Sequence, residues 1–512
     1  MDPGDAKLQT DFRVSIMQIT EQRYADIAAA CDRLLRAPDT SPARLAIPAL
    51  HFLNEHPGCL AQYKPLLTGR SESDLFNLSR AVIRAARGLV RSLATSRPVP
   101  AHEGPVDVLI VSHLLKPDQL RQENDFYFGA LQKLLRERGA TSLLVLISHS
   151  RTTANAGPTQ QFSSPRTVLT GKVSPATEVN IWRQGGSTWS TLRREAAGQP
   201  DSDDRRLALL ASRQALSAPA IMNLRTHASV AELCRAVKPK VVITTYEGAD
   251  LERLIWHAAR SAGRRPLCVG YQHAIVLERA HAIRRALAVP GIDCDPDVIL
   301  TLGEIPHAVL ASSPGLKTTR LIEYGSHRRA QLPELPPPQD RPRRCLVLPD
   351  ASLDEGTTLF EFALACARRS ADISFVLRPH PMADTQALLR RLPGLQNPPA
   401  NVSLSVSTPL EQELAQARYC LYRGSSAALY AVRAGIKPYY LALPGELSFD
   451  CLFPLTHWRE SVTSPEDLLA RINRANPVAD SAAATHAANV CERYVSPVRP
   501  AALDELLAMV TP

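Results

Sequence analysis

The stretch Ile373-Ser374-Phe375-Val376-Leu377-Arg378-Pro379-His380-Pro381 decides the fold of the second half of the chain. Its first five residues form an apolar run typical of a buried strand, and the prolines that follow cannot continue it. A similar unit comes later, where the apolar run Tyr419 to Tyr422 leads into Arg423-Gly424-Ser425-Ser426. Parallel sheets bind ligands beyond the carboxyl ends of their strands, so we expect both units on neighbouring strands of one site.

The side chains after these two strands suit an anion, because they combine cationic donors, hydroxyl groups and a glycine that lets the backbone approach a ligand. The expected anion is a phosphate, which would also face the N-terminus of a helix predicted from Ala427 to Ala434. One of the two serines is placed to cap that helix. The residues expected to bind the phosphate are Arg378, His380, Pro381, Gly424, Ser425 and Ser426.

Strands and helices alternate in two series, as in an α/β protein with parallel sheets. The first series has expected strands at 106–112, 142–147, 240–244, 267–271 and 298–302, with helices at 125–138, 230–237 and 251–261. Between them, residues 151–200 show little periodicity and are interpreted as an insertion or an acceptor-side loop. The second series has expected strands at 345–348, 373–377, 402–406, 419–422 and 438–443, with helices at 358–368, 384–392, 411–416 and 427–434.

The segment 333–342 contains five prolines and separates the two series. Such a run cannot hold a regular element, so it marks the main domain boundary. Residues from about 12 to 94 carry helical spacing and almost no strand alternation. The predicted parts are an α-helical N-terminal extension at 1–95, Rossmann-like domains at 105–330 (acceptor side) and 343–475 (nucleotide-donor side), and C-terminal helices at 476–512.

Composition is that of a globular protein, with 45% hydrophobic and 21% charged residues in a chain of 512. No apolar run approaches the roughly 18 to 20 residues that cross a bilayer, and we expect a cytoplasmic protein. The net charge of +9 suits an anionic partner such as a nucleotide, a polyanionic glycan or the inner leaflet of a membrane, while dispersed basic residues and few aromatics argue against nucleic acid. Ten cysteines without a C-x-x-C pair argue against a zinc site and a disulfide framework, and are interpreted as buried or incidental thiols.

Two further groups of polar residues follow strands of the first series. Glu247 and Asp250 come after the strand at 240–244, where a carboxylate pointing into a cleft could act as a general base, or could simply stabilise a helix N-terminus. Gln272 and His273 follow the strand at 267–271, where they could orient a sugar or accept a proton, although a satisfied interior histidine is the plainer alternative.

In the second series, residues 350–356 follow the first strand and include Asp354 and Glu355. These residues could contact a ribose or an acceptor hydroxyl, and a solvated turn with a helix cap is an equal alternative. Two α/β domains with a cleft between facing strand ends is the organisation of a GT-B glycosyltransferase.

At these residues the chain resembles the bacterial GT-B glycosyltransferases that use CMP-activated acidic sugars, including the sialyltransferases and Kdo transferases of surface-polysaccharide synthesis. The shared features are an HP motif, here His380-Pro381, and a paired-serine motif, here Ser425-Ser426. The resemblance covers about residues 105–475 and implies that this histidine and these serines bind the CMP phosphate.

The family also has an acidic motif of two acids and a glycine, which Asp354-Glu355-Gly356 matches in letters. The family places its catalytic acid in the first domain, whereas this match lies in the second. Glu247-Gly248 lies in the right domain with only one acid. We therefore expect Glu247 to be the catalytic carboxylate, with Asp354 and Glu355 as secondary candidates.

The resemblance implies transfer of a sugar from a CMP-activated Kdo-type or sialic-acid-type donor to a glycan or lipid-linked glycan of capsule or lipopolysaccharide. No cofactor or metal is expected. Three alternatives stay open: a polyol-phosphate transferase of the CDP-glycerol type, a non-catalytic glycan-binding or assembly subunit, and a scaffold recruited through residues 1–95.

Overall fold

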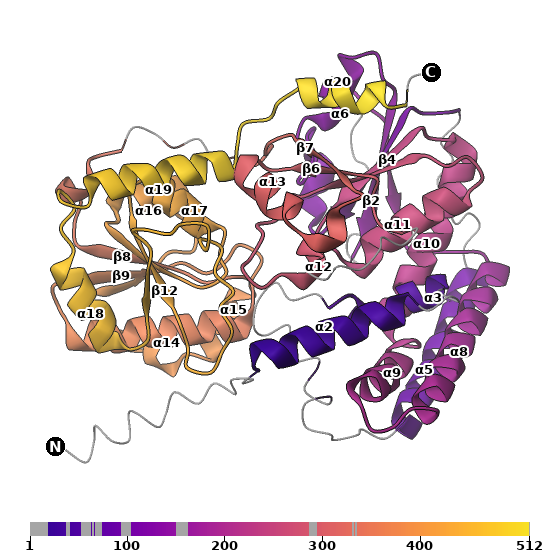
Figure 1. The fold of residues 1–512 in the computed structure, drawn as a ribbon, viewed down its shortest axis with the longest axis horizontal. Coiled ribbons are helices and arrows are strands. Elements are labelled where there is room, and N and C mark those ends of the chain that lie inside the picture. The colour runs from indigo at the N-terminus through magenta and orange to yellow at the C-terminus, as the bar shows by residue number, and fades with distance from the viewer. Residues whose placement is uncertain are drawn as a thin grey trace.

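The computed structural model describes residues 19–36, 41–52, 63, 66, 74–93, 104–149, 162–285, 294–329, 332 and 335–510. Over these residues the chain forms two α/β domains, each built on one parallel sheet, with a layer of helices beside the first domain (Figure 1).

The first sheet has seven strands in the order β3-β2-β1-β4-β5-β6-β7, and every pairing is parallel. The strands are β1 Val108–Leu114, β2 Ser142–Ser148, β3 Arg166–Leu169, β4 Val241–Thr245, β5 Leu267–Tyr271, β6 Val298–Thr301 and β7 Arg320–Glu323. The chain adds strands outward from β1 in one direction and then, from β4, in the other. The carboxyl ends of β1 and β4 therefore border the point where the strand order reverses, the usual ligand crevice of such sheets.

The second sheet has six parallel strands in the order β10-β9-β8-β11-β12-β13, which repeats the same winding. The strands are β8 Arg344–Leu348, β9 Ser374–Leu377, β10 Val402–Leu404, β11 Tyr419–Tyr422, β12 Lys437–Leu441 and β13 Glu460–Val462. The prediction that Arg378 and Ser425 follow neighbouring strands is wrong, because β8 lies between β9 and β11. The two segments instead flank the reversal point of the second sheet.

Helices cover both faces of the sheets. In the first domain they are α6 Leu131–Arg136, α8 Pro175–Ala197, α9 Asp203–Gln214, α10 Ala218–Val237, α11 Asp250–Ser261, α12 His281–Arg284 and α13 Glu304–Ala311. In the second domain they are α14 Leu353–Arg369, α15 Thr385–Arg390, α16 Leu410–Gln416, α17 Ala427–Arg433 and α18 Pro465–Arg474.

Two predictions for the first domain are corrected. The helix expected at 125–138 begins only at Leu131, because the Asp125 carboxylate accepts the backbone N–H groups of Tyr127 and Phe128 and holds a turn there. Within the segment interpreted as a loop at 151–200, the structure has strand β3 and the 23-residue helix α8. Residues 151–161 of that segment lie outside the described residues.

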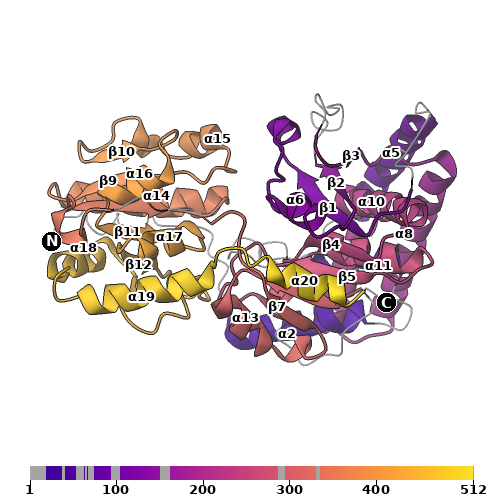
Figure 2. The ribbon, with the colours of Figure 1, turned by 90° about the horizontal axis from the view of Figure 1, so that it is seen from above.

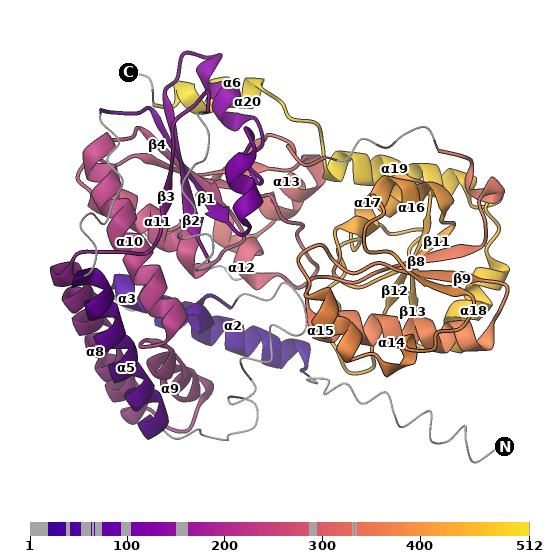
Figure 3. The same ribbon diagram turned by 180° about the vertical axis from the view of Figure 1, so that it is seen from behind.

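The N-terminal region is helical, as predicted, within its described part. Its elements are α2 Glu21–Leu35, α3 Pro42–Leu45, the 3-10 helix η1 Pro48–His51 and α5 Asp74–Leu93. These helices pack against α8 and α9 of the first domain (Figure 3). Ion pairs such as Arg33–Asp204 (2.8 Å) and Arg44–Glu195 (2.5 Å) join them. The region is therefore one helical layer together with α8 and α9.

The chain crosses between the domains twice. After β7 it passes through the proline-rich segment, where residues 335–342 form only the short 3-10 helix Pro338–Asp340. After α19 Ser481–Tyr494, which packs on α17, it returns to the first domain, where Leu503 and Leu506 of α20 Ala501–Ala508 are fully buried in the core (Figure 2). Two parallel-sheet domains connected in this way, with the carboxyl ends of their strands facing a shared cavity, form the GT-B fold.

The nine cysteines in the described part of the chain are buried and free, as predicted for them, and Cys59 lies outside it. Among the described helices, none is long and apolar enough to cross a membrane.

Candidate functional site

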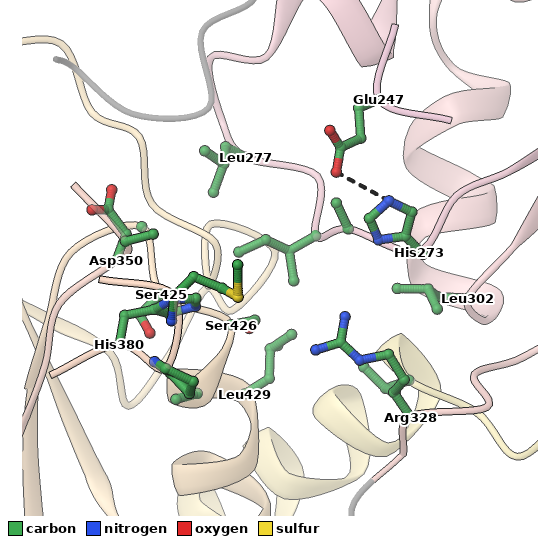
Figure 4. Close-up of a pocket in the computed structure, with 18 of the residues that line it drawn as sticks. Glu247, His273, Leu277, Leu302, Arg328, Asp350, His380, Ser425, Ser426 and Leu429 are labelled. Atoms are coloured by element: carbon green, nitrogen blue, oxygen red, sulfur yellow. Dashed lines mark hydrogen bonds and ion pairs between the residues drawn. The ribbon is translucent and has the colours of Figure 1, made fainter. Parts of the chain in front are cut away.

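A cavity of about 740 Å³ lies between the two domains and receives side chains from both (Figure 4). The first domain contributes residues that follow β1, β4, β5, β6 and β7, and the second contributes residues that follow β8, β9 and β11. Eight of the residues predicted from the sequence line it: Glu247, His273, Arg378, His380, Pro381, Gly424, Ser425 and Ser426.

His380 is oriented as a hydrogen-bond donor. Its Nδ1 accepts the backbone N–H of Met382 at 3.2 Å, so the proton of the neutral ring resides on Nε2. Burial, and then the nearby charge of Arg328, lower the pKa of His380. The ring is therefore neutral near pH 7 and keeps one N–H for a ligand.

Gly424, Ser425 and Ser426 line the same wall of the cavity as His380. Gly424 has φ of 61°, a left-handed conformation that favours glycine. Ser426 occupies the cap position of α17, but its side chain makes no capping hydrogen bond, so that part of the prediction is wrong. Ser425 is 4% exposed and Ser426 is exposed.

The two arginines of these segments have different surroundings. Arg378 lines the cavity while donating to the carbonyl oxygen of Thr408 at 2.6 Å. Arg423 is buried and donates to the carboxylates of Glu355 and Glu446, each at 2.6 Å. Arg423 therefore holds the loop after β11 in place from behind the cavity.

Asp350 lies at the end of β8, beside His380 and Ser425 in Figure 4. One carboxylate oxygen accepts the backbone N–H of Ser352 at 2.7 Å, and the other, Oδ2, is buried without a hydrogen-bond partner. Burial and the nearby Glu355 carboxylate raise the pKa of Asp350 to about 7. The group is thus half protonated near neutral pH and can donate or accept a hydrogen bond.

Glu247 and His273 face each other on the first-domain wall. His273 Nε2 lies 3.1 Å from Glu247 Oε1, and the side chains are 10% and 27% exposed respectively. The ring of Tyr127 packs edge-on against His273 with 4.7 Å between centroids. The more exposed Glu247 is therefore the member of the pair that a bound substrate meets first.

The backbone of the loop that carries Glu247 is held by hydrogen bonds to the Glu252 carboxylate. Glu252 accepts the N–H groups of residues 247, 248 and 249 at 2.9 to 3.0 Å. Burial, and then the charge of Glu247, raise the pKa of Glu252 to about 8. Gly248 has φ of 81° and a side chain there would overlap the carbonyl oxygen of Ala282. Only glycine fits this turn without strain.

A histidine pair lies behind Glu247. His113 Nε2 is 3.1 Å from Thr245 Oγ1, and His113 Nδ1 is 2.9 Å from His149 Nε2. Burial, and then the charge of His149, lower the pKa of His113 to about 3. His113 is therefore neutral and supports the end of β4 by hydrogen bonding.

Arg328 is a cavity residue that the sequence reasoning missed. It follows β7, its guanidinium lies 4.4 Å from the Phe126 ring centroid, and it projects into the cavity between the two walls (Figure 4). It has no ion-pair partner within the described part of the chain. Because β7 is a short edge strand with an exposed first residue, no continuous apolar run marks the segment before Arg328 in the sequence.

Four predicted site residues lie outside the cavity lining, namely Gln272, Asp250, Asp354 and Glu355. The Gln272 amide is fully buried, donates to the Ala274 carbonyl at 2.6 Å and accepts from the Leu302 N–H at 3.0 Å. Asp250 is half-buried and accepts a hydrogen bond from the Asn223 amide at 2.6 Å, and desolvation raises its pKa to about 6. Both side chains serve the protein's own structure.

The acidic pair of the second domain is also turned elsewhere. Asp354 is 69% exposed and pairs with Arg391 at 2.5 Å, and Glu355 pairs with Arg423 as described above. Among the described residues, no group of three or more His, Cys, Asp or Glu could hold a metal ion.

No protein-family model matches this chain, and no curated protein does. Solved structures resemble it at low identity. The glycosyltransferase SnogD from Streptomyces nogalater shares 17% identity with a TM-score of 0.42, over 80% of this chain and 100% of that one. UDP-GlcNAc 2-epimerase from Neisseria meningitidis, bound to UDP-GlcNAc, shares 12% with a TM-score of 0.43, over 79% and 100%. MurG from Acinetobacter baumannii shares 11% with a TM-score of 0.40, over 79% and 99%. These values support no conclusion about the reaction, which has to be argued from the site.

Proposed function

We propose that this protein is a glycosyltransferase that moves an acidic sugar, of the Kdo or sialic-acid type, from a CMP-activated donor to a glycan or lipid-linked glycan of capsule or lipopolysaccharide. The proposal is supported by one cavity that holds a phosphate-binding wall, a carboxylate–histidine pair and a cation between them.

The second-domain wall suits a single phosphate. His380 offers its Nε2–H, and the hydroxyls of Ser425 and Ser426 lie on the same wall. A monophosphate leaving group carries less charge than a diphosphate, and neutral donors suffice to bind it. We infer that the departing CMP is stabilised by these protein donors, without a metal ion or cofactor, so that activity persists in the presence of a chelator.

Arg328 is the single observation that favours an acidic sugar. Its guanidinium lies between the phosphate wall and the Glu247–His273 pair, where the transferred sugar would be held. A sugar carboxylate matches the planar donor geometry of arginine, and two parallel hydrogen bonds would fix its orientation. A neutral hexose would leave this cation without a partner.

Glu247 carries the proton transfer in this proposal. If the reaction inverts the anomeric centre, Glu247 accepts the proton of the acceptor hydroxyl, and His273 holds the carboxylate in place by donating to it. If the reaction retains the configuration, the same carboxylate is placed to act as the nucleophile.

The test is a donor assay with purified protein, supplied in turn with CMP-Kdo, CMP-sialic acid, CDP-glycerol and UDP-GlcNAc together with a surface-glycan acceptor. Release of CMP with a phosphate-free product supports the proposal. CMP release with phosphate in the product identifies a polyol-phosphate transferase, and transfer from UDP-GlcNAc alone identifies a different donor class. No transfer from any donor favours the non-catalytic glycan-binding or assembly subunit.

The Arg328→Ala variant distinguishes binding of the sugar from binding of the nucleotide. We expect the KM for an acidic-sugar donor to rise about 10- to 100-fold while the affinity for free CMP changes little, because CMP lacks the carboxylate. Equal loss for donor and free CMP would assign Arg328 to the nucleotide instead. Arg121→Ala, an exposed arginine outside the cavity lining, is the matched control.

A further inference from the structure

Helix α5 exposes a row of large apolar side chains. Val82, Val90 and Leu93 are each about two-thirds exposed, at 68%, 67% and 68%, and Ile83 and Leu89 are 51% and 37% exposed. Single exposed apolar residues are ordinary on protein surfaces, but a contiguous group marks a surface that binds something.

These five residues share one face of the helix. The spacing 82, 83, 89, 90 and 93 matches the i, i+1, i+7, i+8 and i+11 positions of an α-helix, which fall within a stripe about 120° wide. The opposite face is the one that packs on the protein: Ala81, Gly88 and Ser92 are buried there. At Gly88 a side chain would overlap the buried Glu178 carboxylate and its partner Arg225, so this face is fixed and the apolar stripe cannot rotate inward.

Arginines border the apolar stripe. Arg80 and Arg87 are exposed, and Arg84, on the same side of the helix, donates to the Leu216 carbonyl at 3.0 Å. Arg80 lowers the pKa of Arg84, after burial as the main cause, so the two charges are close. An apolar stripe bordered by arginines is the pattern of a helix that lies in the interface of a membrane containing anionic lipids.

The helix is also accessible as part of the whole molecule. It lies on the outer side of the helical layer, away from α19 on the second domain and from α20 on the first, whose connecting segment crosses between the domains on the opposite side (Figures 2 and 3). A flat surface can therefore approach α5 without displacing the elements that connect the two domains.

We propose that α5 binds the protein to a membrane that carries anionic lipids, with Val82, Val90 and Leu93 inserted at the acyl boundary and Arg80 and Arg87 at the headgroups. A second copy of the chain fits the charges less well, because it would bring one arginine row against another. The inference rests on the proposed function only for its purpose, which is to bring the enzyme to a lipid-linked acceptor.

The test is sedimentation of the full-length protein with vesicles of phosphatidylglycerol and phosphatidylcholine, compared with pure phosphatidylcholine, without donor or acceptor. We expect binding to the mixed vesicles that weakens as salt rises. Val82→Glu/Val90→Glu should lower the partition coefficient at least tenfold. Arg80→Gln/Arg87→Gln should lower it roughly fivefold per arginine.

The matched controls are Val478→Glu and Arg121→Gln, which alter similarly exposed residues elsewhere and should bind as the unmodified protein does. Circular dichroism confirms that each variant is folded. No binding of the unmodified protein, equal binding to both vesicle types, or full binding by Val82→Glu/Val90→Glu would overturn the proposal. A dimer in light scattering that this variant converts to a monomer would assign the stripe to a second copy. Failure here leaves the donor assay unaffected, so the two proposals are tested separately.

Discussion

Two separate contacts hold Glu247 at the cavity. His273 contacts its carboxylate at 3.1 Å, and Glu252 accepts its backbone N–H at 2.9 Å. The side chain is thus oriented while 27% of it stays exposed. In the proposed reaction, a base that is fixed before the substrate arrives would need little reorganisation.

Replacing this carboxylate should therefore remove turnover and spare donor binding. We expect Glu247→Gln to lower kcat by about 10²- to 10⁴-fold, the usual contribution of a general base, with the CMP affinity changed less than about threefold. Steady-state kinetics and calorimetry on the same preparation measure both values. Asp354→Asn, on the surface acid, is the control and should leave kcat unchanged. Full activity of Glu247→Gln would remove this residue from the chemistry.

If the cavity binds CMP as proposed, Asp350 should make this binding depend on pH. Its pKa is raised to about 7 from an ordinary 3.8, and a phosphate beside it is bound best while the carboxyl is protonated. CMP affinity should fall as pH rises through 7, by about three- to tenfold. The phosphate of CMP titrates near pH 6, so Asp350→Asn is measured in parallel. The variant should lose only the part of the pH dependence near 7, and identical profiles would exclude Asp350.

Asp350 also affects the free energy of unfolding, in the opposite sense to an acid held in a salt bridge. Between pH 3.8 and about 7 the unfolded chain releases this proton while the folded chain keeps it, so the contribution of Asp350 to the free energy of unfolding falls as pH rises. Its stabilising effect is complete at acidic pH and is lost above the folded pKa.

The β4–α11 loop is the element that positions Glu247 at the cavity. It places Glu247 through a single left-handed glycine and three N–H groups bonded to Glu252. This arrangement leaves no room for a side chain at residue 248.

Gly248→Ala should therefore cost more than backbone strain alone. Gly263→Ala is the control, because Gly263 also has a positive φ, 116°, but open space around it. Both changes carry the strain of a left-handed residue, about 1 to 2 kcal/mol, and Gly248→Ala adds about 1 to 3 kcal/mol for the overlap. Urea unfolding measures the difference. Equal losses of stability in the two variants would show that the backbone at Ala282 moves aside without an energetic cost.

The sequence predicted the central strands well and the edges poorly, for a physical reason. Strands buried on both faces, such as β5 and β11, are continuous apolar runs, and their predicted limits coincide with the structure. The edge strands β7 and β13 contain partly or fully exposed residues, so they lack a continuous apolar run. Helix α8 was missed because its middle carries Gly185-Gly186 and many polar residues.

Side-chain direction was the part of the site that sequence could not supply. The position of Gln272 after a strand was predicted correctly, yet its amide is bound by the backbone at Ala274 and Leu302. Arg328 shows the converse, since it reaches the cavity from a segment with no evident motif. Both outcomes depend on contacts between segments far apart in the chain.

On the scale of the whole molecule, the two sheets place their reversal points on opposite walls of one cavity. The first carries the Glu247–His273 pair and the second carries the proposed phosphate-binding residues, so a donor substrate would lie between the two domains. The proposed function thus divides proton transfer and phosphate binding between the two domains.

The most direct test is calorimetric binding of CMP, CDP, UDP and GDP to the protein and to its His380→Ala variant. We expect selective binding of CMP, weakened in the variant by roughly 1.5 to 3 kcal/mol, because a hydrogen bond to a charged phosphate is lost. Selective binding of UDP or GDP would contradict the acidic-sugar donor. Binding of none of the four nucleotides, or CMP affinity unchanged in the variant, would contradict the phosphate site itself.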